Sequence, residues 1–272
     1  MSYLTNPYMV SPSSASWMDD SKLMAYWKFN ESSGNIVNAS QSSDSLGSDG
    51  DLIMTGGTYE QSAPLGSSNA LLFDGTDDFG AVSSGSNTLS QFNFIHEGQS
   101  TFCYWMKLVS SVNYGVIFMN DNWTPNAGTK VITSRDAPCG TACGTLNQTV
   151  MNGEALEANS VIVDHSYGQP PTNSGYIPDI TDYYFYTTRI DVDETTDTLI
   201  GNRDTADETK GNRINAPLED DSPSAFTIAK RSNASQYFAN ILISEMSIWN
   251  RILTNDEING LYNSGSGRAI YE

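Results

Sequence analysis

Apolar residues recur at every second position in many short segments of this chain, and turns rich in Gly, Asp and Ser separate the segments. In LMAYWKFN (23–30), Leu23, Ala25, Trp27 and Phe29 form one face, and the residues between them form the other. A period of two is typical of a β-strand that buries one face. Many short strands with almost no helical periodicity indicate an all-β sandwich or jelly roll.

The segment STFCYWMKLV (100–109) is the strongest strand candidate, because it is apolar on both faces. We expect it at the centre of a sheet, with Trp105, like Trp27, in the core. The other strand candidates are residues 50–54, 70–75, 78–82, 115–119, 130–134, 160–164, 183–191, 225–230 and 238–249.

One helix is predicted, close to the C-terminus. Thr254 followed by Glu257 has the spacing of a capping box, and Ile258, Leu261 and Tyr262 then recur at helical spacing. The predicted fold class is therefore all-β: a two-sheet antiparallel β-sandwich of jelly-roll type with a short C-terminal helix.

The chain divides into an arm and one domain. Residues 1–20 are rich in Ser, Pro and Asn and show no periodicity, so we expect an extended N-terminal arm. Residues 21–272 then form a single domain, with an irregular insertion at about 135–180. The arm carries more apolar residues than a solvated linker needs, which favours burial along a neighbouring subunit or a carrier protein. Packing back on its own sandwich is the alternative.

Acidic residues outnumber basic ones: Asp and Glu total 32, Lys and Arg total 13, and the formal charge is −19. Such a chain repels phosphate backbones and anionic lipid surfaces, so we expect neither nucleic acid nor membrane insertion. The N-terminus lacks the basic region of a secretory signal peptide, and Asn6 and Pro7 interrupt its apolar run. We expect a virion or extracellular-surface location; an intracellular protein or a mature chain is the alternative.

The three cysteines cannot form a full disulfide framework. Cys139 and Cys143 have the spacing to bridge a small loop or to stay reduced, and no histidine lies near them in sequence to complete a metal site. Cys103 lies in an apolar strand candidate, where we expect it to be buried and inert.

The turn FDGTDD offers the densest group of carboxylates beside a strand: Asp74, Asp77 and Asp78. Ca²⁺ prefers six to eight oxygen ligands, which such carboxylates and loop carbonyls supply. The simpler interpretation is a tight turn at Asp74 and Gly75 with the other acids solvated or accepting backbone N–H groups. Calcium is therefore a hypothesis for this turn.

Sugar binding would need exposed aromatic rings beside amide and carboxylate groups. Trp123, Tyr167 and Tyr176 lie in turn-like sequence and are the candidate ligand-binding residues; packing or interface roles are the alternative. For catalysis, the paired carboxylates of a glycosidase are not evident at Glu154 and Glu157. Asp164 and His165 beside Tyr167 are a weak signal for lyase chemistry. We expect no enzyme.

Three segments together resemble the laminin-G-like branch of the concanavalin A-like lectin/glucanase superfamily. They are AYWKFNESSGN (25–35), NALLFDGTDDFGAV (69–82) and ISEMSIWNRILTNDEINGLYN (243–263), and they occur in the family's order. The resemblance implies a concanavalin A-like jelly roll, frequent calcium, and recognition of glycan or protein. It does not fix a ligand, because the fold hosts many functions.

The sequence therefore predicts a non-catalytic, lectin-like module that recognises glycan or a protein surface. The most favoured setting is the surface of a virus particle, as a capsid decoration or a tail or fibre component, with homo-oligomer or carrier contacts made by the N-terminal arm. A purely structural protein without glycan binding is the second hypothesis. A glycan-active hydrolase or lyase is the third.

Overall fold

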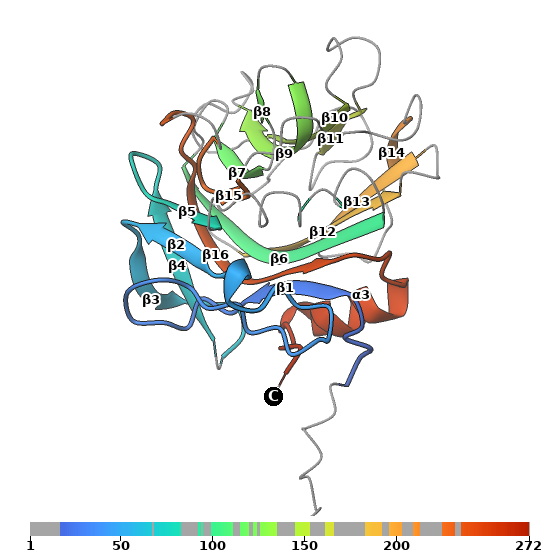
Figure 1. Cartoon of the computed structure of the whole chain (residues 1–272), viewed down its shortest axis with the longest axis horizontal. Coiled ribbons are helices and arrows are strands. Elements are labelled where there is room, and N and C mark those ends of the chain that lie inside the picture. The colour runs from blue at the N-terminus through green and yellow to red at the C-terminus, as the bar shows by residue number, and fades with distance from the viewer. Residues whose placement is uncertain are drawn as a thin grey trace, which may run out of the picture.

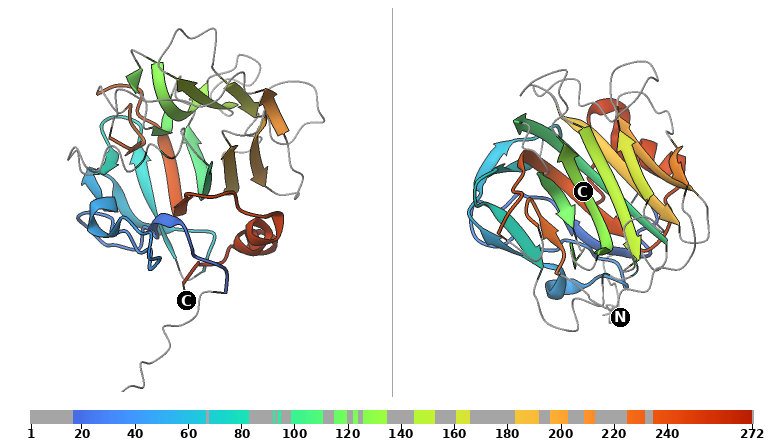
Figure 2. Two further views of the ribbon diagram at one scale, coloured as in Figure 1. Left: turned by 45° about the vertical axis from the view of Figure 1, so that its right-hand side comes forward. Right: turned by 90° about the horizontal axis from the view of Figure 1, so that it is seen from above.

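The computed structural model describes residues 17–66, 68–82, 92, 94, 99–110, 115–119, 122–123, 126–134, 145–152, 161–165, 183–191, 196–202, 209–212, 225–231 and 235–271. Within these residues, two sheets of eight strands each lie face to face, and all the strand pairs are antiparallel (Figures 1 and 2). The predicted fold class, an antiparallel β-sandwich with one short C-terminal helix, is confirmed.

The first sheet has the strand order β14-β13-β12-β6-β16-β4-β3, and β1 pairs with β16. Its strands are β1 (Leu23–Trp27), β3 (Thr58–Ser62), β4 (Asn69–Asp74), β6 (Gln99–Ser110), β12 (Tyr184–Asp191), β13 (Thr196–Asn202), β14 (Thr209–Asn212) and β16 (Asn240–Trp249). As expected, the segment 100–109 forms a central strand, β6, because both of its faces are apolar and covered.

The second sheet has the order β11-β10-β9-β7-β15-β5-β2, and β8 pairs with β9. Its strands are β2 (Leu52–Thr55), β5 (Phe79–Val82), β7 (Val116–Met119), β8 (Asn122–Trp123), β9 (Asn126–Ser134), β10 (Thr145–Asn152), β11 (Val161–His165) and β15 (Thr227–Ile228). The helical elements are η1 (Gly47–Gly50), α3 (Asn255–Tyr262) and η2 (Asn263–Gly265). Within the described residues, no helix has the length and apolar character needed to cross a membrane.

Two strand boundaries differ from the prediction. The expected strand 23–30 ends at Trp27, because Phe29 has a φ of 59°, which a regular strand cannot contain. The candidate 225–230 shortens to β15, Thr227–Ile228, and Ala229 also has a positive φ of 65°. Within the stretch expected to be irregular, 135–180, the predicted strand 160–164 forms β11, and residues 145–152 form β10, which the sequence does not predict.

The main core lies between the sheets and is rich in aromatic rings. Trp27 stacks on Phe226 with ring centroids 5.7 Å apart, and Phe102 stacks on Phe118 at 4.7 Å. Helix α3 lies against the outer face of the first sheet (Figure 1). A second apolar cluster there includes Trp105 together with Ile258 and Leu261 of the helix. Trp27 and Trp105 are therefore core residues, as the strand pattern predicts.

Arg251 fixes the corner between β16 and helix α3. Its guanidinium donates to both carboxylate oxygens of Glu257, at 2.6 and 3.1 Å, and to the carbonyls of Asp19 and Ser21. The predicted capping box is present: Thr254 Oγ1 accepts from the Glu257 N–H, and the Glu257 carboxylate accepts from the Thr254 N–H. Helix α3 therefore begins where sequence predicts.

The last residues of the expected arm pack on their own domain. The Trp17 indole N–H donates to the Ala269 carbonyl at 2.8 Å, and the Arg268 guanidinium lies 4.4 Å from the Trp17 ring centroid. Asp20 accepts a hydrogen bond from the Tyr271 hydroxyl at 2.8 Å. For residues 17–20 the intramolecular alternative therefore holds, and residues 1–16 lie outside the described residues.

Candidate functional site

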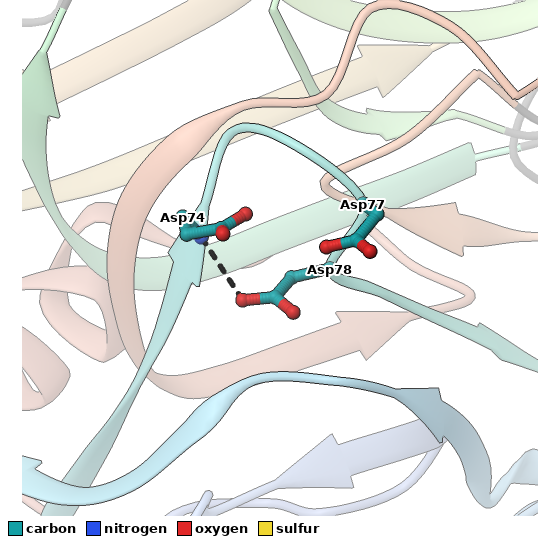
Figure 3. Close-up of side chains that lie close together, drawn as sticks. All are labelled: Asp74, Asp77 and Asp78. Carbon is teal, nitrogen blue, oxygen red and sulfur yellow. Dashed lines mark hydrogen bonds between the residues drawn. The ribbon is translucent and has the colours of Figure 1, made fainter.

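The three predicted metal ligands are brought together by the turn between β4 and β5. One carboxylate oxygen each of Asp74, Asp77 and Asp78 lies within 4.8 Å of the others (Figure 3). Asp74 ends β4, and Gly75 allows the tight turn with a φ of 79°. One short turn therefore accounts for the clustering of the three carboxylates.

Some of the carboxylate oxygens already accept hydrogen bonds from backbone N–H groups of the turn. Asp78 Oδ2 accepts from the Asp74 N–H at 3.1 Å (Figure 3). Asp74 Oδ1 accepts from the Thr76 N–H at 2.7 Å. Asp78 is buried and lies against Gly56, where a Cβ would come within 1.8 Å of its Oδ1. Asp74 and Asp77 are exposed. The remaining oxygens fit the donor type that Ca²⁺ prefers, and calcium here stays a prediction.

Of the three predicted sugar-binding aromatics, Trp123 is the one that lies among the described residues. Trp123 lies on β8, where its backbone pairs with that of Asn126 on β9. Tyr167 and Tyr176 lie outside the described residues, as do Cys139, Cys143, Glu154 and Glu157. Asp164 and His165 lie on β11, opposite Asn147 and Leu146 of β10. The binding role of the three aromatics stays a prediction.

Cys103 is buried on the outer face of the first sheet, as expected. Burial raises the pKa of its thiol to about 12, although the Thr187 hydroxyl at 3.7 Å opposes the shift. The thiol therefore stays protonated near neutral pH and is a poor nucleophile.

A pocket that the sequence does not predict lies on the outer face of the first sheet, beside Glu245. Strand β16 changes its partner there: Ile243 pairs with Leu71 of β4, whereas Met246 pairs with Trp27 of β1. The pairing of β16 with β6 is also irregular between Ser244 and Ser247. Glu245 lies in this bulge with a φ of 52°, an unusual conformation for a residue other than glycine.

The Glu245 side chain is 7% exposed, and both its oxygens are hydrogen-bonded. Ser68 Oγ donates to Oε1 at 2.6 Å, and the Tyr26 hydroxyl donates to Oε2. No Lys or Arg among the described residues forms an ion pair with it. Burial raises the pKa of this carboxyl above its ordinary value, although the two hydroxyls and nearby Lys28 oppose the shift. Burial and the adjacent Glu245 likewise raise the pKa of Tyr26.

The pocket has a volume of about 460 Å³, within the usual range of small-molecule sites. The end of β1, the loop before β4, the β16 bulge and the C-terminal segment form it: Lys28, Asn30, Leu65, Gly66, Ser68, Glu245, Ser266, Gly267, Arg268, Ala269 and Tyr271. Gly267 lets the last segment pass close to the sheet, because a Cβ there would lie 2.2 Å from Leu65 Cδ1. A larger residue at position 267 would therefore clash with the Leu65 side chain in the pocket wall.

Two cations lie at this pocket. Lys28 Nζ donates to the Tyr271 carbonyl at 3.2 Å and lies 5.8 Å from the Tyr26 ring centroid. Arg268 is exposed and stacks on Trp17. The pocket therefore combines a buried carboxylate, hydroxyl and amide groups, and two positive charges around a partly apolar floor. The one sequence signal for it is Glu245 itself, an acid inside the apolar run of β16.

No protein-family model matches this chain, and no curated protein matches it. Solved structures do match. The receptor-binding domain of a botulinum neurotoxin C/D mosaic serotype is 16% identical with a TM-score of 0.58, over 89% of this chain and 51% of that one. The binding domain of botulinum neurotoxin DC, in complex with rat synaptotagmin II, is 14% identical with a TM-score of 0.54, over 89% and 51%.

A sialidase from Trypanosoma rangeli, solved with 2,3-difluorosialic acid, is 14% identical with a TM-score of 0.51, over 90% of this chain and 34% of that one. This chain thus spans about half of each toxin domain and about a third of the sialidase. At these identities the matches show the β-sandwich fold alone. Membership of the laminin-G-like branch stays a prediction.

Proposed function

We propose that this domain is a non-catalytic recognition module that binds carbohydrate in the pocket beside Glu245. The observation that carries the proposal is the buried carboxylate on a strained, bulged backbone, facing a cavity of about 460 Å³. Unusual backbone conformations of this kind cluster at functional sites, where the surrounding structure maintains them.

The chemistry of the walls suits a polyol. Sugar hydroxyls need acceptors and donors in alternation, and the carboxylate of Glu245, the hydroxyl of Ser68 and the amide of Asn30 supply both. Leu65 offers an apolar surface for the C–H face of a sugar ring. The Glu245 oxygens keep lone pairs beyond those used by Tyr26 and Ser68, because each carboxylate oxygen accepts two hydrogen bonds.

Proteins of known structure that share this fold bind glycolipids or proteins, which supports a binding function. One botulinum neurotoxin match, over 89% of this chain and with a TM-score of 0.56, concerns type C toxin that depends on two ganglioside molecules for cell entry. Another holds synaptotagmin II, a protein. Glycan and protein surfaces are therefore both proposed as partners here, with glycan first because of the pocket.

A glycan array with the full chain tests the proposal. We expect binding to a subset of glycans, and we expect Glu245→Gln to weaken it about tenfold or more by removing a charged acceptor. Glu60→Gln is the matched control, because Glu60 is exposed and outside the pocket. Glycan binding that Glu245→Gln leaves intact would overturn this site, and a blank array would favour the purely structural alternative.

An enzyme is the second candidate, because a carboxyl with a raised pKa is the usual general acid of a glycosidase. Glycosidases pair two carboxyl groups, and Glu245 is the single carboxylate among the described residues that line the pocket. The raised pKa of Tyr26 makes its hydroxyl a poor base near neutral pH. Turnover on a polysaccharide panel that disappears in Glu245→Gln would favour the enzyme.

We also propose that Asp74, Asp77 and Asp78 hold Ca²⁺, which would stabilise the β4–β5 turn (Figure 3). A ligand that binds only the folded state at about 100 times its Kd adds about 2.7 kcal/mol of stability. Chelation should therefore lower the melting temperature, and Asp77→Ala should abolish this sensitivity. An unchanged melting temperature, with no calcium found by elemental analysis, would contradict the proposal.

For the setting, we propose a surface component of a virus particle, with the N-terminal arm making homo-oligomer or carrier contacts. The arm's apolar residues support this, and residues 17–20 anchor it on the domain. Deletion of residues 2–16 should leave the melting temperature nearly unchanged and weaken self-association, measured by analytical ultracentrifugation. A large loss of monomer stability with normal self-association would contradict the arm's role.

A further inference from the structure

Three chain segments surround the pocket beside Glu245: residues 28–30 after β1, residues 65–68 before β4, and residues 266–271 after η2. Each segment contributes at least one exposed residue to the lining, namely Asn30, Gly66 and Ser266. These exposed residues mark the mouth of the pocket, whereas Glu245, which is 7% exposed, lies at its inner end.

Two contacts join the segment before β4 to its neighbours. Asn30 Oδ1 accepts from the Asn69 N–H at 2.7 Å, which ties the residues after β1 to the start of β4. Gly267 lies directly against Leu65, because a Cβ at Gly267 would come within 2.2 Å of Leu65 Cδ1. The wall is therefore continuous from the end of β1 to the C-terminal segment.

Two hydrogen bonds join the C-terminal segment back to β1. Lys28 Nζ donates to the Tyr271 carbonyl at 3.2 Å, and the Ile270 N–H donates to the Tyr26 hydroxyl at 3.3 Å. With the contacts at Asn30 and Gly267, these bonds complete a ring of three segments around the pocket.

The inner end of the pocket is closed. A second cavity shares Glu245 with the pocket, and buried residues such as Trp105 and Phe185 line the rest of it. Its volume is about 10 Å³, close to the least space that one water needs. A sugar chain therefore has no room to continue past Glu245, and a ligand enters and leaves by the mouth.

We infer that this pocket takes the free end of a glycan chain, which in a glycoconjugate is the non-reducing end. The terminal sugar enters through the mouth, its hydroxyls contact Glu245 and Ser68, and the rest of the chain stays outside. A sugar in the middle of a chain is linked on two sides and would need an open groove. The inference rests on the proposed carbohydrate binding and adds which part of the glycan is bound.

A glycan array printed through the reducing ends tests it with the full chain. Each glycan is paired with the same glycan extended by one further sugar at its non-reducing end. We expect the bound glycans to share a terminal sugar, and the extension to weaken binding about tenfold or more, because the added sugar clashes with the closed wall. The methyl glycoside of the shared terminal sugar should compete for binding.

Gly66→Leu should block the mouth without disturbing the fold. Gly66 is exposed, its backbone is outside the left-handed region, and a Cβ there would meet no atom within 4 Å. We expect about a tenfold or larger loss of glycan binding at an unchanged melting temperature. Ser43→Leu is the matched control, because it places the same side chain at an exposed position outside the pocket.

Leu65→Ala should open the wall where Leu65 meets Gly267, so that the extended glycans bind more nearly as well as the unextended ones. Leu65 is buried, so the melting temperature of this variant is measured first. Should Leu65→Ala fail to fold, the array pairs and Gly66→Leu still decide the outcome.

Equal binding of extended and unextended glycans by the parent would overturn the inference and leave carbohydrate binding intact. Binding of no glycan would overturn the proposed function as well. A preference for chain ends that Gly66→Leu leaves unchanged would overturn the assignment of the mouth, and one that a folded Leu65→Ala retains in full would overturn the closed wall.

Discussion

Two glutamates, one within strand β16 and one on the helix that follows it, have opposite kinds of partner. Glu257, on helix α3, forms a two-point ion pair with Arg251 and accepts hydrogen bonds from Thr254. Partial burial alone would raise its pKa, but these partners lower it below the ordinary value. Glu245, in the β16 bulge, has two hydroxyl partners and no ion pair among the described residues, and burial raises its pKa.

The carboxylate of Glu257 therefore stabilises the fold, whereas the carboxylate of Glu245 costs stability and is kept in position by the packing around it. The Arg251–Glu257 pair closes the corner between β16, helix α3 and the backbone of Asp19 and Ser21. Glu245 instead has a positive φ of 52° and a desolvated charge, both of which cost stability. A costly carboxylate that faces a pocket is the better candidate for a functional residue.

The largest effect is expected at Trp105, in the apolar cluster that includes residues of helix α3. Its ring packs on Phe185 and Tyr262, with centroids 5.2 and 6.0 Å away, and is 3% exposed. Trp105→Ala should lower the free energy of unfolding by about 3–5 kcal/mol, through loss of burial and a cavity. Urea denaturation measures this; a loss below about 1 kcal/mol would mean that the β6 register is wrong.

An intermediate effect is expected at the corner. Arg251→Ala should cost about 2 kcal/mol, because it removes a charge-assisted, two-point contact and two bonds to carbonyls. The pKa of Glu257 is lowered in the folded state, so its contribution is present above the unfolded value of about 4.5 and is lost as pH falls through the folded value. The difference in the free energy of unfolding between Arg251→Ala and the parent should therefore become smaller at low pH.

Arg251→Lys is the matched control, because lysine keeps the positive charge but cannot make the two-point contact of a guanidinium. Its free energy of unfolding should lie between those of Arg251→Ala and the parent. Neither variant should change sugar affinity. A tenfold loss of affinity in Arg251→Ala, with a normal melting temperature, would break the distinction between the two glutamates.

The smallest effect on stability is expected at Glu245. The pKa of Glu245 is raised in the folded state, so its bound proton stabilises the fold. This stabilisation is complete below about pH 4.5, the pKa in the unfolded chain, and is lost as pH rises through the pKa in the folded state. Glu245→Gln cannot ionise, so it should match the parent near pH 4 and be equally or slightly more stable at pH 7, within about 1 kcal/mol. The melting temperatures of Glu245→Gln and the parent between pH 4 and pH 7 measure this difference. If Glu245→Gln became less stable than the parent as pH rises, Glu245 would not be a destabilising, desolvated carboxylate.

Local patterns were sufficient to predict most of the fold. The alternation in 100–109 gives β6, and the spacing of Thr254 and Glu257 gives the helix start, because both depend on residues that are neighbours in sequence. Strand β3 escapes prediction, since its five residues alternate between exposed and half-buried without apolar alternation. It forms because β4 offers an edge to pair with.

The candidate site was predictable only where a single turn forms it. Asp74, Asp77 and Asp78 are close in sequence, so their clustering follows from one tight connection. Glu245 depends on Ser68, 177 positions away, and on Tyr26, 219 positions away. No pattern within the segment 243–263 shows that the strand bulges there or that the C-terminal segment forms a wall.

Trp17 bonded to Ala269, and Asp20 bonded to Tyr271, place the two ends of the described domain side by side. Domains with neighbouring ends tolerate circular permutation, because a short linker can join the old ends without stretching the fold. Because Trp17 and Ala269 both lie beside Arg268, a tag or support attached at either end of the described domain would lie close to the pocket and could hinder access to it.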